Sequence, residues 1–260
     1  MKILFIGDIV GKPGRDAVTA IVPKLRQERG VQFVIANAEN AAGGSGITPK
    51  VAQELFDARC DVLTSGDHIW KKPDIFELIQ SDRRVLRPLN YPPGAPGAGW
   101  AVFNCDQAKI GVINLLGRVF MEPLEDPFRM VRDAVAEISK ETRLIFVDMH
   151  AEATSEKIAL GWFLAGQVTA VLGTHTHIQT ADERVLPGGT AYLTDAGMTG
   201  PYESVIGRKV ENVLQRFLTA VPVRFEIATG DVRLCGAIVD ADEKTGRAKT
   251  IERVQVPLPA

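Results

Sequence analysis

The sequence has few cysteines and no long hydrophobic run. Its three cysteines, Cys60, Cys105 and Cys235, are far apart and form no C-x-x-C pair, so neither a disulfide framework nor a cysteine zinc site is expected. The apolar run at the amino terminus stops at Asp8, too early for a signal-peptide core, and no run reaches the ~18 residues of a membrane span. These absences predict a cytoplasmic protein with no membrane partner.

The sequence also lacks an excess of either charge. Thirty Lys and Arg against 32 Asp and Glu give a net charge of −2, which argues against a broad surface for duplex nucleic acid. The 260 residues are 45% hydrophobic and 24% charged, which is typical of a folded protein that can bury a core without disulfides. Because no repeat or linker interrupts the chain, we expect a single domain over residues 1–260.

Short apolar runs alternate with amphipathic stretches. This order favours parallel strands joined by helices, and Thr48 before Pro49 marks one helix start. The predicted strands are 2–6, 31–36, 61–64, 100–103, 109–115, 143–149, 168–172 and 191–194. The predicted helices are 16–29, 49–59, 73–80, 127–140, 154–165 and 204–218. Residues 88–99 read as a loop, and 221–227, 232–240 and 247–256 as an antiparallel meander.

Histidine is scarce, and its placement is the strongest functional signal. All four histidines, His68, His150, His175 and His177, stand just past the end of a predicted strand. In open α/β sheets ligands bind beyond the carboxyl ends of the strands, so we expect these side chains to converge. One histidine there could equally be a cap or a hydrogen-bonding group. Four in the same kind of position indicate metal ligands.

Carboxylates follow the first strands at the same level. Asp8, Glu39 with Asn40, and Asp67 come after the first, second and third strands. Asp8 or Asp67 could be a helix N-cap, whereas Glu is a weak N-cap and glycines 43 and 44 delay the next helix. Together with the histidines, these groups supply enough ligands for two divalent cations. The absence of cysteine among them favours hydrolytic Mn, Fe, Mg or Zn over structural zinc.

Five segments carry a resemblance to a known family: 7–15, 37–44, 150–157, 173–177 and 194–200. The run Gly-Thr-His-Thr-His at 173–177 resembles the metallophosphoesterase (calcineurin-like) superfamily. The runs Asn-Ala-Glu-Asn at 37–40 and His-Ala-Glu-Ala-Thr-Ser-Glu-Lys at 150–157 are similar to the YmdB-type bacterial cyclic-nucleotide phosphodiesterases. The resemblance extends over nearly the whole chain.

The resemblance implies an α/β fold, a four-layer α/β/β/α sandwich with a mostly parallel first sheet and a C-terminal antiparallel meander. It also implies a binuclear site with two divalent ions, Mn or Fe in preference to Mg or Zn. Carried over position by position, Asp8, Asn40 and His177 would hold one metal, Asp67, His150 and His175 the other, with Glu39 bridging and His68 as the catalytic acid.

The implied activity is hydrolysis of a small phosphodiester, a 2′,3′- or 3′,5′-cyclic nucleotide, by a metal-bridging hydroxide. Separately, we expect the protein to be a homo-oligomer. The alternative is a metal- and nucleotide-binding regulatory protein with weak or no turnover. Trp70, Tyr91 and Tyr202 are available to stack a base, although ordinary packing explains each of them as well.

One position departs from the family pattern. The family has Gly-Asn-His where this chain has Gly66-Asp67-His68. An ionised Asp67 adds a negative charge to the site. We therefore expect tighter metal binding, weaker Lewis acidity and a higher pKa of the bridging water than with asparagine.

Overall fold

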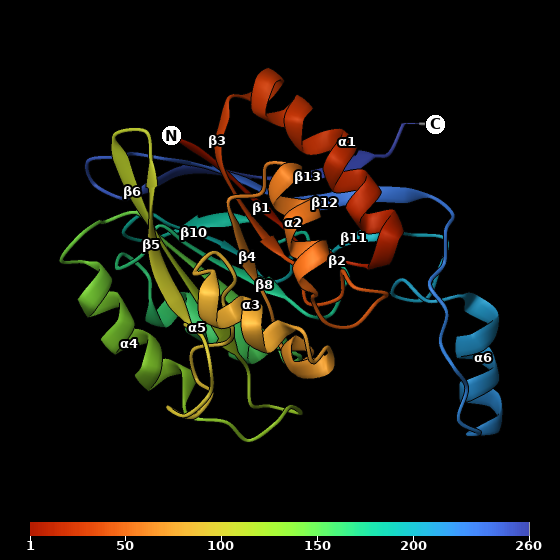
Figure 1. Ribbon diagram of the computed structural model, residues 1–260. Coiled ribbons are helices and arrows are strands. Elements are labelled where there is room, and N and C mark those ends of the chain that lie inside the picture. Colours follow the sequence, from red (N-terminus) through yellow and green to blue (C-terminus); the bar gives the residue numbers. More distant parts are fainter. Residues whose placement is uncertain (260) are drawn as a thin grey trace.

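Two β-sheets lie face to face at the centre of the molecule, and helices cover their outer faces (Figure 1). The computed structural model describes residues 1–259. The first sheet contains β1 (Lys2–Ile6), β2 (Asp8–Ile9), β3 (Val31–Asn37), β4 (Val62–Thr64), β11 (Met198–Pro201), β12 (Val232–Ala241) and β13 (Ala248–Pro257). Its strands follow one another in the order β2-β11-β12-β1-β3-β4, and β13 pairs with β12. The second, in the order β5-β6-β7-β8-β10-β9, is built from β5 (Trp100–Cys105), β6 (Ala108–Leu116), β7 (Ile145–His150), β8 (Ala170–Thr174), β9 (Arg184–Leu186) and β10 (Thr190–Leu193).

Helices form the outer layers. On the first sheet lie α1 (Gly11–Arg29), α2 (Pro49–Asp57), the short 3₁₀ helix η1 (Ile69–Lys71) and α3 (Ile75–Ser81). On the second lie α4 (Pro127–Ile138) and α5 (Thr154–Phe163). The last helix, α6 (Val210–Thr219), stands apart from both sheets at the right of Figure 1. No helix within residues 1–259 combines the length and apolar character needed to cross a membrane.

Three hydrophobic clusters separate these layers. In β1 the side chains alternate, so that Ile3 and Phe5 join the cluster between the sheets while Leu4 and Ile6 join the cluster under α1 and α2. A third cluster packs α4 and α5 onto the second sheet. Because both faces of the sheets are covered, their strands read as continuous apolar runs. The predicted four-layer α/β/β/α sandwich is confirmed.

The strand pairing directs the functional loops to one edge. Within the first sheet β1, β3 and β4 are parallel, and within the second β6, β7, β8 and β10 are parallel. The carboxyl ends of parallel strands meet at the same edge, so the loops after β3, β4, β7 and β8 can contribute to one site.

The predicted capping signal at Thr48 is present. Its side chain accepts a hydrogen bond from the Val51 N–H at 3.3 Å, and Pro49 opens α2. The first helix, α1, begins at Gly11 rather than at the predicted residue 16. Helix α1 can include Pro13 because the first turn of a helix tolerates proline, since its N–H groups have no intrahelical acceptor.

The tail differs from the predicted meander. Residues 232–241 and 248–257 form the hairpin β12–β13, but 221–227 form no strand. That segment returns alongside the start of α6, where the Lys209 N–H donates to the Glu226 carbonyl at 2.9 Å and the Ala228 N–H to the Gly207 carbonyl at 3.0 Å. Pro222 lies inside the segment, and only Ile227 forms a bridge there, an isolated one with Arg208, so the segment remains irregular within residues 1–259. Helix α6 starts at Val210 rather than at residue 204, and β2, β9 and β11 are additional strands.

Candidate metal centre and active site

The side chains predicted for the site lie together where the strands end. Asp8 follows β1, and His150 is the last residue of β7; the others stand in loops after β3, β4 and β8. Both sheets therefore contribute. The structure brings together Asp8, Glu39, Asn40, Asp67, His68, His150, His175 and His177.

Four of them form a tight cluster. One ligand atom from each of Glu39, Asp67, His150 and His175 lies within 4.8 Å of the others. The Nε2 atom of His150 is 3.2 Å from Glu39 Oε1 and 3.2 Å from Asp67 Oδ1, and His175 Nδ1 is 3.0 Å from that same nitrogen. Oxygen and nitrogen donors gathered in this way suit a divalent cation.

A second group adjoins this cluster. The Nε2 atom of His177 is 3.8 Å from Asp8 Oδ1 and 3.2 Å from the Asn40 amide nitrogen. That amide also lies 3.2 Å from Glu39 Oε1, so Glu39 stands between the two groups. Rotating the amide by 180° would present its oxygen to the same space and turn its N–H donor toward His68 Nδ1, so that His68 stays hydrogen-bonded to Asn40 in either orientation.

The carboxylates of this centre lack a permanent cation. Asp8, Glu39 and Asp67 pair with no lysine or arginine within residues 1–259, and their recorded partners of opposite charge are imidazoles. The Asp8 Oδ1 atom is buried and accepts no hydrogen bond from the described residues. Buried carboxylates without compensation are costly. The donor set therefore fits divalent metal ions.

The protonation equilibria respond to this crowding. Burial lowers the pKa of His150, but the charge of Glu39 and the hydrogen bond to Asp67 outweigh it and raise that pKa well above the usual value. Burial and the positive charge of His150 lower the pKa of His175. Burial raises the pKa of Glu39 and of Asp67, but contact with His150 reverses the effect, and both pKa values are lowered. Glu39 and Asp67 are thus ionised near neutral pH, as metal ligands must be.

Each histidine of the centre has one ring nitrogen turned inward and the other held from outside. The Nδ1 atom of His150 lies 2.9 Å from Thr174 Oγ1, and Nε2 of His175 lies 3.1 Å from Glu152 Oε2. The Nδ1–H of His177 donates to the Ile206 carbonyl oxygen at 3.0 Å. Such partners fix the orientation of metal-binding imidazoles. Glu152 and Ile206 were not foreseen from the sequence.

A buried carboxylate supports His150 from behind. Asp148 accepts hydrogen bonds from the Thr174 hydroxyl at 2.7 Å, the Asn37 amide at 3.0 Å and the Thr64 hydroxyl. Burial raises the pKa of Asp148 to about 6 despite these donors and the nearby His150. The chain of contacts from His150 through Thr174 to Asp148 sets which His150 nitrogen faces the centre.

The loop that carries His175 and His177 is held in an unusual conformation. Their φ angles are 101° and 65°, in the region that L-residues rarely adopt. Asp195 restrains this loop, since its Oδ2 accepts from the Thr176 N–H at 3.1 Å and from the Thr176 hydroxyl at 2.7 Å. The same oxygen accepts from Lys157 Nζ at 2.7 Å, and both charged side chains are only 1% exposed.

His68 lies beside the centre rather than within its tightest cluster. Its Nδ1 is 2.8 Å from Asn40 Oδ1, its backbone N–H donates to Glu39 Oε2 at 3.1 Å, and its side chain is 32% exposed. Gly66 permits this packing, because a Cβ at that position would overlap the Glu39 carboxylate and the His150 ring. An anchored, partly exposed imidazole can exchange a proton with a bound ligand.

A cavity of about 330 Å³ opens over the centre, near the lower end of the ~300–1,000 Å³ typical of small-ligand sites. Besides Glu39, Asn40 and three of the histidines, its lining includes Arg208, which the sequence did not single out. None of the three aromatic candidates lines it. Trp70 packs edge-on against the buried Tyr91, and the Tyr202 hydroxyl donates to the Met198 carbonyl at 3.0 Å.

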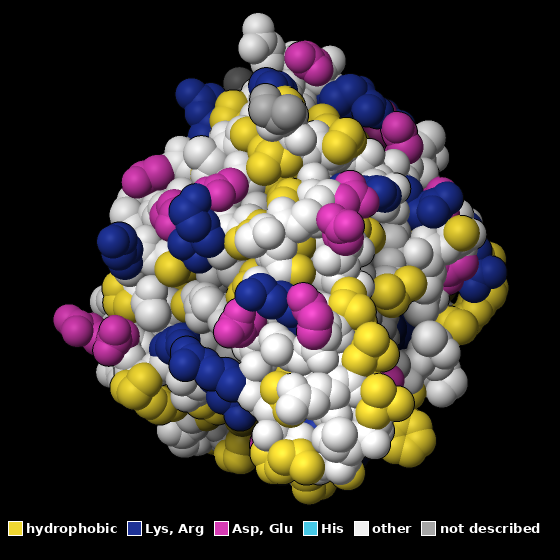
Figure 2. All heavy atoms as spheres, turned by 90° about the vertical axis from the view of Figure 1, so that its right-hand side faces the viewer, with side chains coloured by type: hydrophobic (Ala, Val, Ile, Leu, Met, Phe, Trp, Pro, Cys, Tyr) yellow, Lys and Arg dark blue, Asp and Glu magenta, His cyan; other side chains and the backbone are white. Residues whose placement is uncertain are grey.

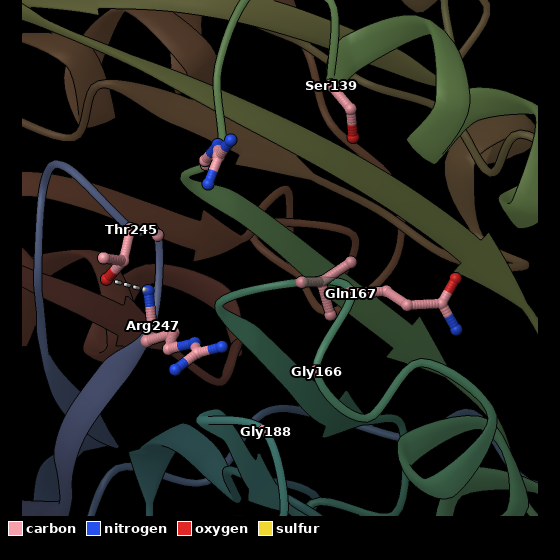
Figure 3. Close-up of a pocket in the computed structure, with 9 residues that line it drawn as sticks. Ser139, Gly166, Gln167, Gly188, Thr245 and Arg247 are labelled. Carbon is pink, nitrogen blue, oxygen red and sulfur yellow. Dashed lines mark hydrogen bonds between the residues drawn. The ribbon is translucent and has the colours of Figure 1, made fainter.

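A second cavity lies at the opposite ends of the same strands, before β7 and β8 (Figure 3). It is lined by Arg143, Gln167 and Arg247, with Ser139, Thr245 and several glycines, and it contains no carboxylate or histidine. It therefore lacks the donors that divalent cations bind. The chemistry is concentrated at the carboxyl edge.

The fold and the convergent acid–histidine centre define a metallophosphoesterase-type hydrolase. Comparison with known proteins narrows this class. The family described as YmdB-like protein matches residues 4–254. The chain is 49% identical to a 2′,3′-cyclic-nucleotide 2′-phosphodiesterase of Bacillus subtilis, over 98% of this chain and 97% of that one.

Solved structures of related proteins share this fold over nearly the whole chain. A protein from Thermus thermophilus is 41% identical with a TM-score of 0.94, and the match covers 100% of both chains. A phosphatase from Mycoplasma pneumoniae is 33% identical with a TM-score of 0.93, covering 99% of this chain and 93% of the other. This chain belongs to the YmdB-like family and is a hydrolytic phosphoesterase.

Proposed function

We propose that this phosphoesterase uses two divalent metal ions to hydrolyse 2′,3′-cyclic nucleotides. The observation that carries the proposal is the group formed by the buried Asp8 and Glu39, the half-buried Asp67 and the inward-facing imidazoles. No lysine or arginine within residues 1–259 pairs with these carboxylates, and Asp8 Oδ1 has no hydrogen-bond partner there. The substrate class is supported by the name of the B. subtilis relative. The 3′,5′-cyclic alternative has no such support.

In the proposal each of the two groups holds one ion. Asp8, Asn40 and His177 would hold the first, and Asp67, His150 and His175 the second, with Glu39 reaching both. Mixed carboxylate and imidazole ligands suit Mn and Fe, while Mg and Zn are the alternatives. When bound, the two ions supply Lewis acidity and an attacking hydroxide near neutral pH.

His68 would deliver the proton that the leaving ribose oxygen needs. Its Nδ1 is anchored on Asn40, and its ring borders the cavity, so a proton on the other nitrogen can face a bound ester. Asn40 would thus link the position of this acid to the metal centre.

Metal analysis of the purified protein, followed by assays on a substrate panel, tests the proposal. We expect about two ions per chain and the fastest turnover with 2′,3′-cyclic nucleotides among cyclic nucleotides, model diesters, monoesters and RNA. Faster turnover of monoesters would make the enzyme a phosphatase. Tight nucleotide binding with negligible turnover in Mn²⁺ would favour the regulatory alternative.

The role of His68 has its own test. The variant His68→Ala should lower kcat by about 10²- to 10⁴-fold while the metal content stays unchanged. Loss of metal from this variant would instead make His68 a ligand.

We also propose that the enzyme is a cytoplasmic homo-oligomer. Its three cysteines are free and buried, in accord with a reducing compartment. In α6, Leu214, Phe217 and Leu218 are 51–82% exposed, and hydrophobic side chains gather along the lower right of the face in Figure 2. Exposed apolar surface of this kind usually contacts a partner, which here would be a second copy. Light scattering should give an oligomer mass, and Phe217→Glu should reduce it.

A further inference from the structure

Arg208 places a positive charge at the metal cavity. It lies in the short segment between β11 and α6 and lines the cavity together with Glu39, His68 and His177. Its guanidinium donates to the Gly44 carbonyl oxygen, and it forms no ion pair with any carboxylate of residues 1–259. Arg208 is partly buried, and this burial lowers its pKa, although a guanidinium remains charged near neutral pH.

The backbone holds this arginine in place. The Val205 N–H donates to the Arg208 carbonyl at 2.9 Å, and the Arg208 N–H donates back to Val205 at 3.0 Å, which closes a tight turn. Between these residues, the Ile206 carbonyl accepts from His177. One turn therefore contacts a predicted metal ligand and presents a cation to the same cavity.

Gly44 provides the space for the guanidinium. Its φ angle is +86°, and a Cβ at this position would overlap the Arg208 side chain. The glycine thus serves both as hydrogen-bond acceptor and as the gap in which the arginine lies. An arginine fixed in this way has further guanidinium N–H groups that can donate to a bound ligand. It is therefore positioned to bind a planar or tetrahedral oxyanion.

We propose that Arg208 binds a non-bridging phosphate oxygen of the substrate and holds the phosphodiester monoanion against the metal centre. This inference rests on the proposed function and deepens it, because it assigns a residue to substrate binding. The arginine compensates the ester's negative charge, and the ester in turn supplies the anion that this guanidinium lacks.

The test compares Arg208→Gln with wild type in the Mn²⁺-loaded protein. We expect the KM for a 2′,3′-cyclic nucleotide to rise about 10- to 100-fold, the loss of one charge-assisted hydrogen-bonding group, with a smaller change in kcat. The inhibition constant of inorganic phosphate should rise in parallel. Metal content should not change. Arg208→Lys keeps the positive charge but loses the paired N–H donors of the guanidinium. Its KM should therefore lie between those of the wild type and Arg208→Gln.

Two further variants control for indirect effects. Arg83→Gln removes an exposed arginine that has no ion pair within residues 1–259 and should leave KM unchanged. Gly44→Ala keeps the arginine but places a methyl group against its guanidinium and against the Ile227 side chain. If its metal content stays unchanged, it should raise KM in the same direction as Arg208→Gln.

Unchanged KM and phosphate inhibition in a metal-loaded Arg208→Gln enzyme would overturn the inference. If Arg83→Gln raised KM as much as Arg208→Gln does, the effect would not be specific to Arg208, and the inference would also be overturned. If the wild type hydrolyses no diester, the proposed function fails. Phosphate binding, measured by calorimetry, then still decides the role of Arg208: binding that is weaker in Arg208→Gln supports it, and equal binding rejects it.

Discussion

Two groups of buried charges lie close together in this molecule, and they differ in one respect. The Lys157–Asp195 pair is complete: Asp195 Oδ2 accepts from Lys157 and Thr176, and Oδ1 accepts from the Gly197 N–H at 2.8 Å. The metal centre is incomplete, since Asp8 Oδ1 has no partner within residues 1–259 and the centre's carboxylates contact only imidazoles as cationic groups.

This difference separates support from ligand binding. A buried charge that is already neutralised by the fold has nothing left to offer a ligand, whereas a cluster with surplus negative charge is completed by a cation. The Lys157–Asp195 pair holds the loop after β8 in place. That loop carries His175 and His177, which belong to the incomplete cluster.

The largest effect is expected from the incomplete cluster. Glu39→Gln removes the one carboxylate that stands between the two groups of ligands while keeping its shape. Metal affinity and activity should fall by more than about 10²-fold. Changing a residue that only holds a metal ligand in place costs up to about 10²-fold, and loss of a ligand itself should cost more. Elemental analysis and the diesterase assay measure both. Full metal retention would show that Glu39 is not a ligand.

Breaking the complete pair should act on stability. Lys157→Met leaves the Asp195 carboxylate buried without its cation and should cost about 3–5 kcal/mol in the free energy of unfolding, measured in urea. The double variant Lys157→Met with Asp195→Asn should recover part of this loss, because no uncompensated charge remains. A loss below about 1 kcal/mol would mean that the pair is not the support we describe.

Metal removal should have an effect that depends on pH. The raised pKa of His150 stabilises the metal-free protein fully below pH ~6.5, and this contribution is lost as the pH rises through the raised value. The lowered pKa values of Glu39 and Asp67 act in the opposite direction, and their contribution is lost only in acid. Metal competes with these protons.

The increase in Tm on adding Mn²⁺ to chelator-treated protein should therefore grow from pH ~5.5 to pH ~8. When the free Mn²⁺ concentration is about 100 times Kd, the free energy of unfolding should rise by about 2.7 kcal/mol for each site. A constant increase across this range would contradict the assignment of His150 as a ligand. Glu39→Gln serves as the control, since it should show little increase at any pH.

The smallest effect concerns the departure at residue 67. Asp67→Asn introduces the residue that the family resemblance implies at this position and removes one negative charge from the centre. Metal affinity should fall, and the acidic limb of the pH–rate profile should move to lower pH by up to about one unit. Unchanged affinity and an unchanged profile would mean that the extra charge is neutralised elsewhere.

Much of the fold and of the site residues could be predicted from local patterns. Apolar runs marked most strands, Thr48 with Pro49 marked a helix start, and the histidines just past strand ends indicated one edge of a sheet. These signals are local because a strand and the loop after it are adjacent in sequence. The metal roles of the side chains remain predictions.

Other features depend on contacts between distant parts of the chain. Asn37 meets Asp148 across 111 positions, and Arg208 meets Gly44 across 164. No spacing within one segment reveals such pairs. The segment 221–227 had the residues of a strand, but no neighbouring strand pairs with it.

The sequence by itself determined which side chains stand at the strand ends, because hydrophobic periodicity and loop residues are encoded locally. Only the tertiary structure decided which carboxylates are left without a cation, which arginine faces them and which lysine is buried behind them. Charge compensation depends on distance through space and on exclusion of water, and both arise only when the two sheets pack together.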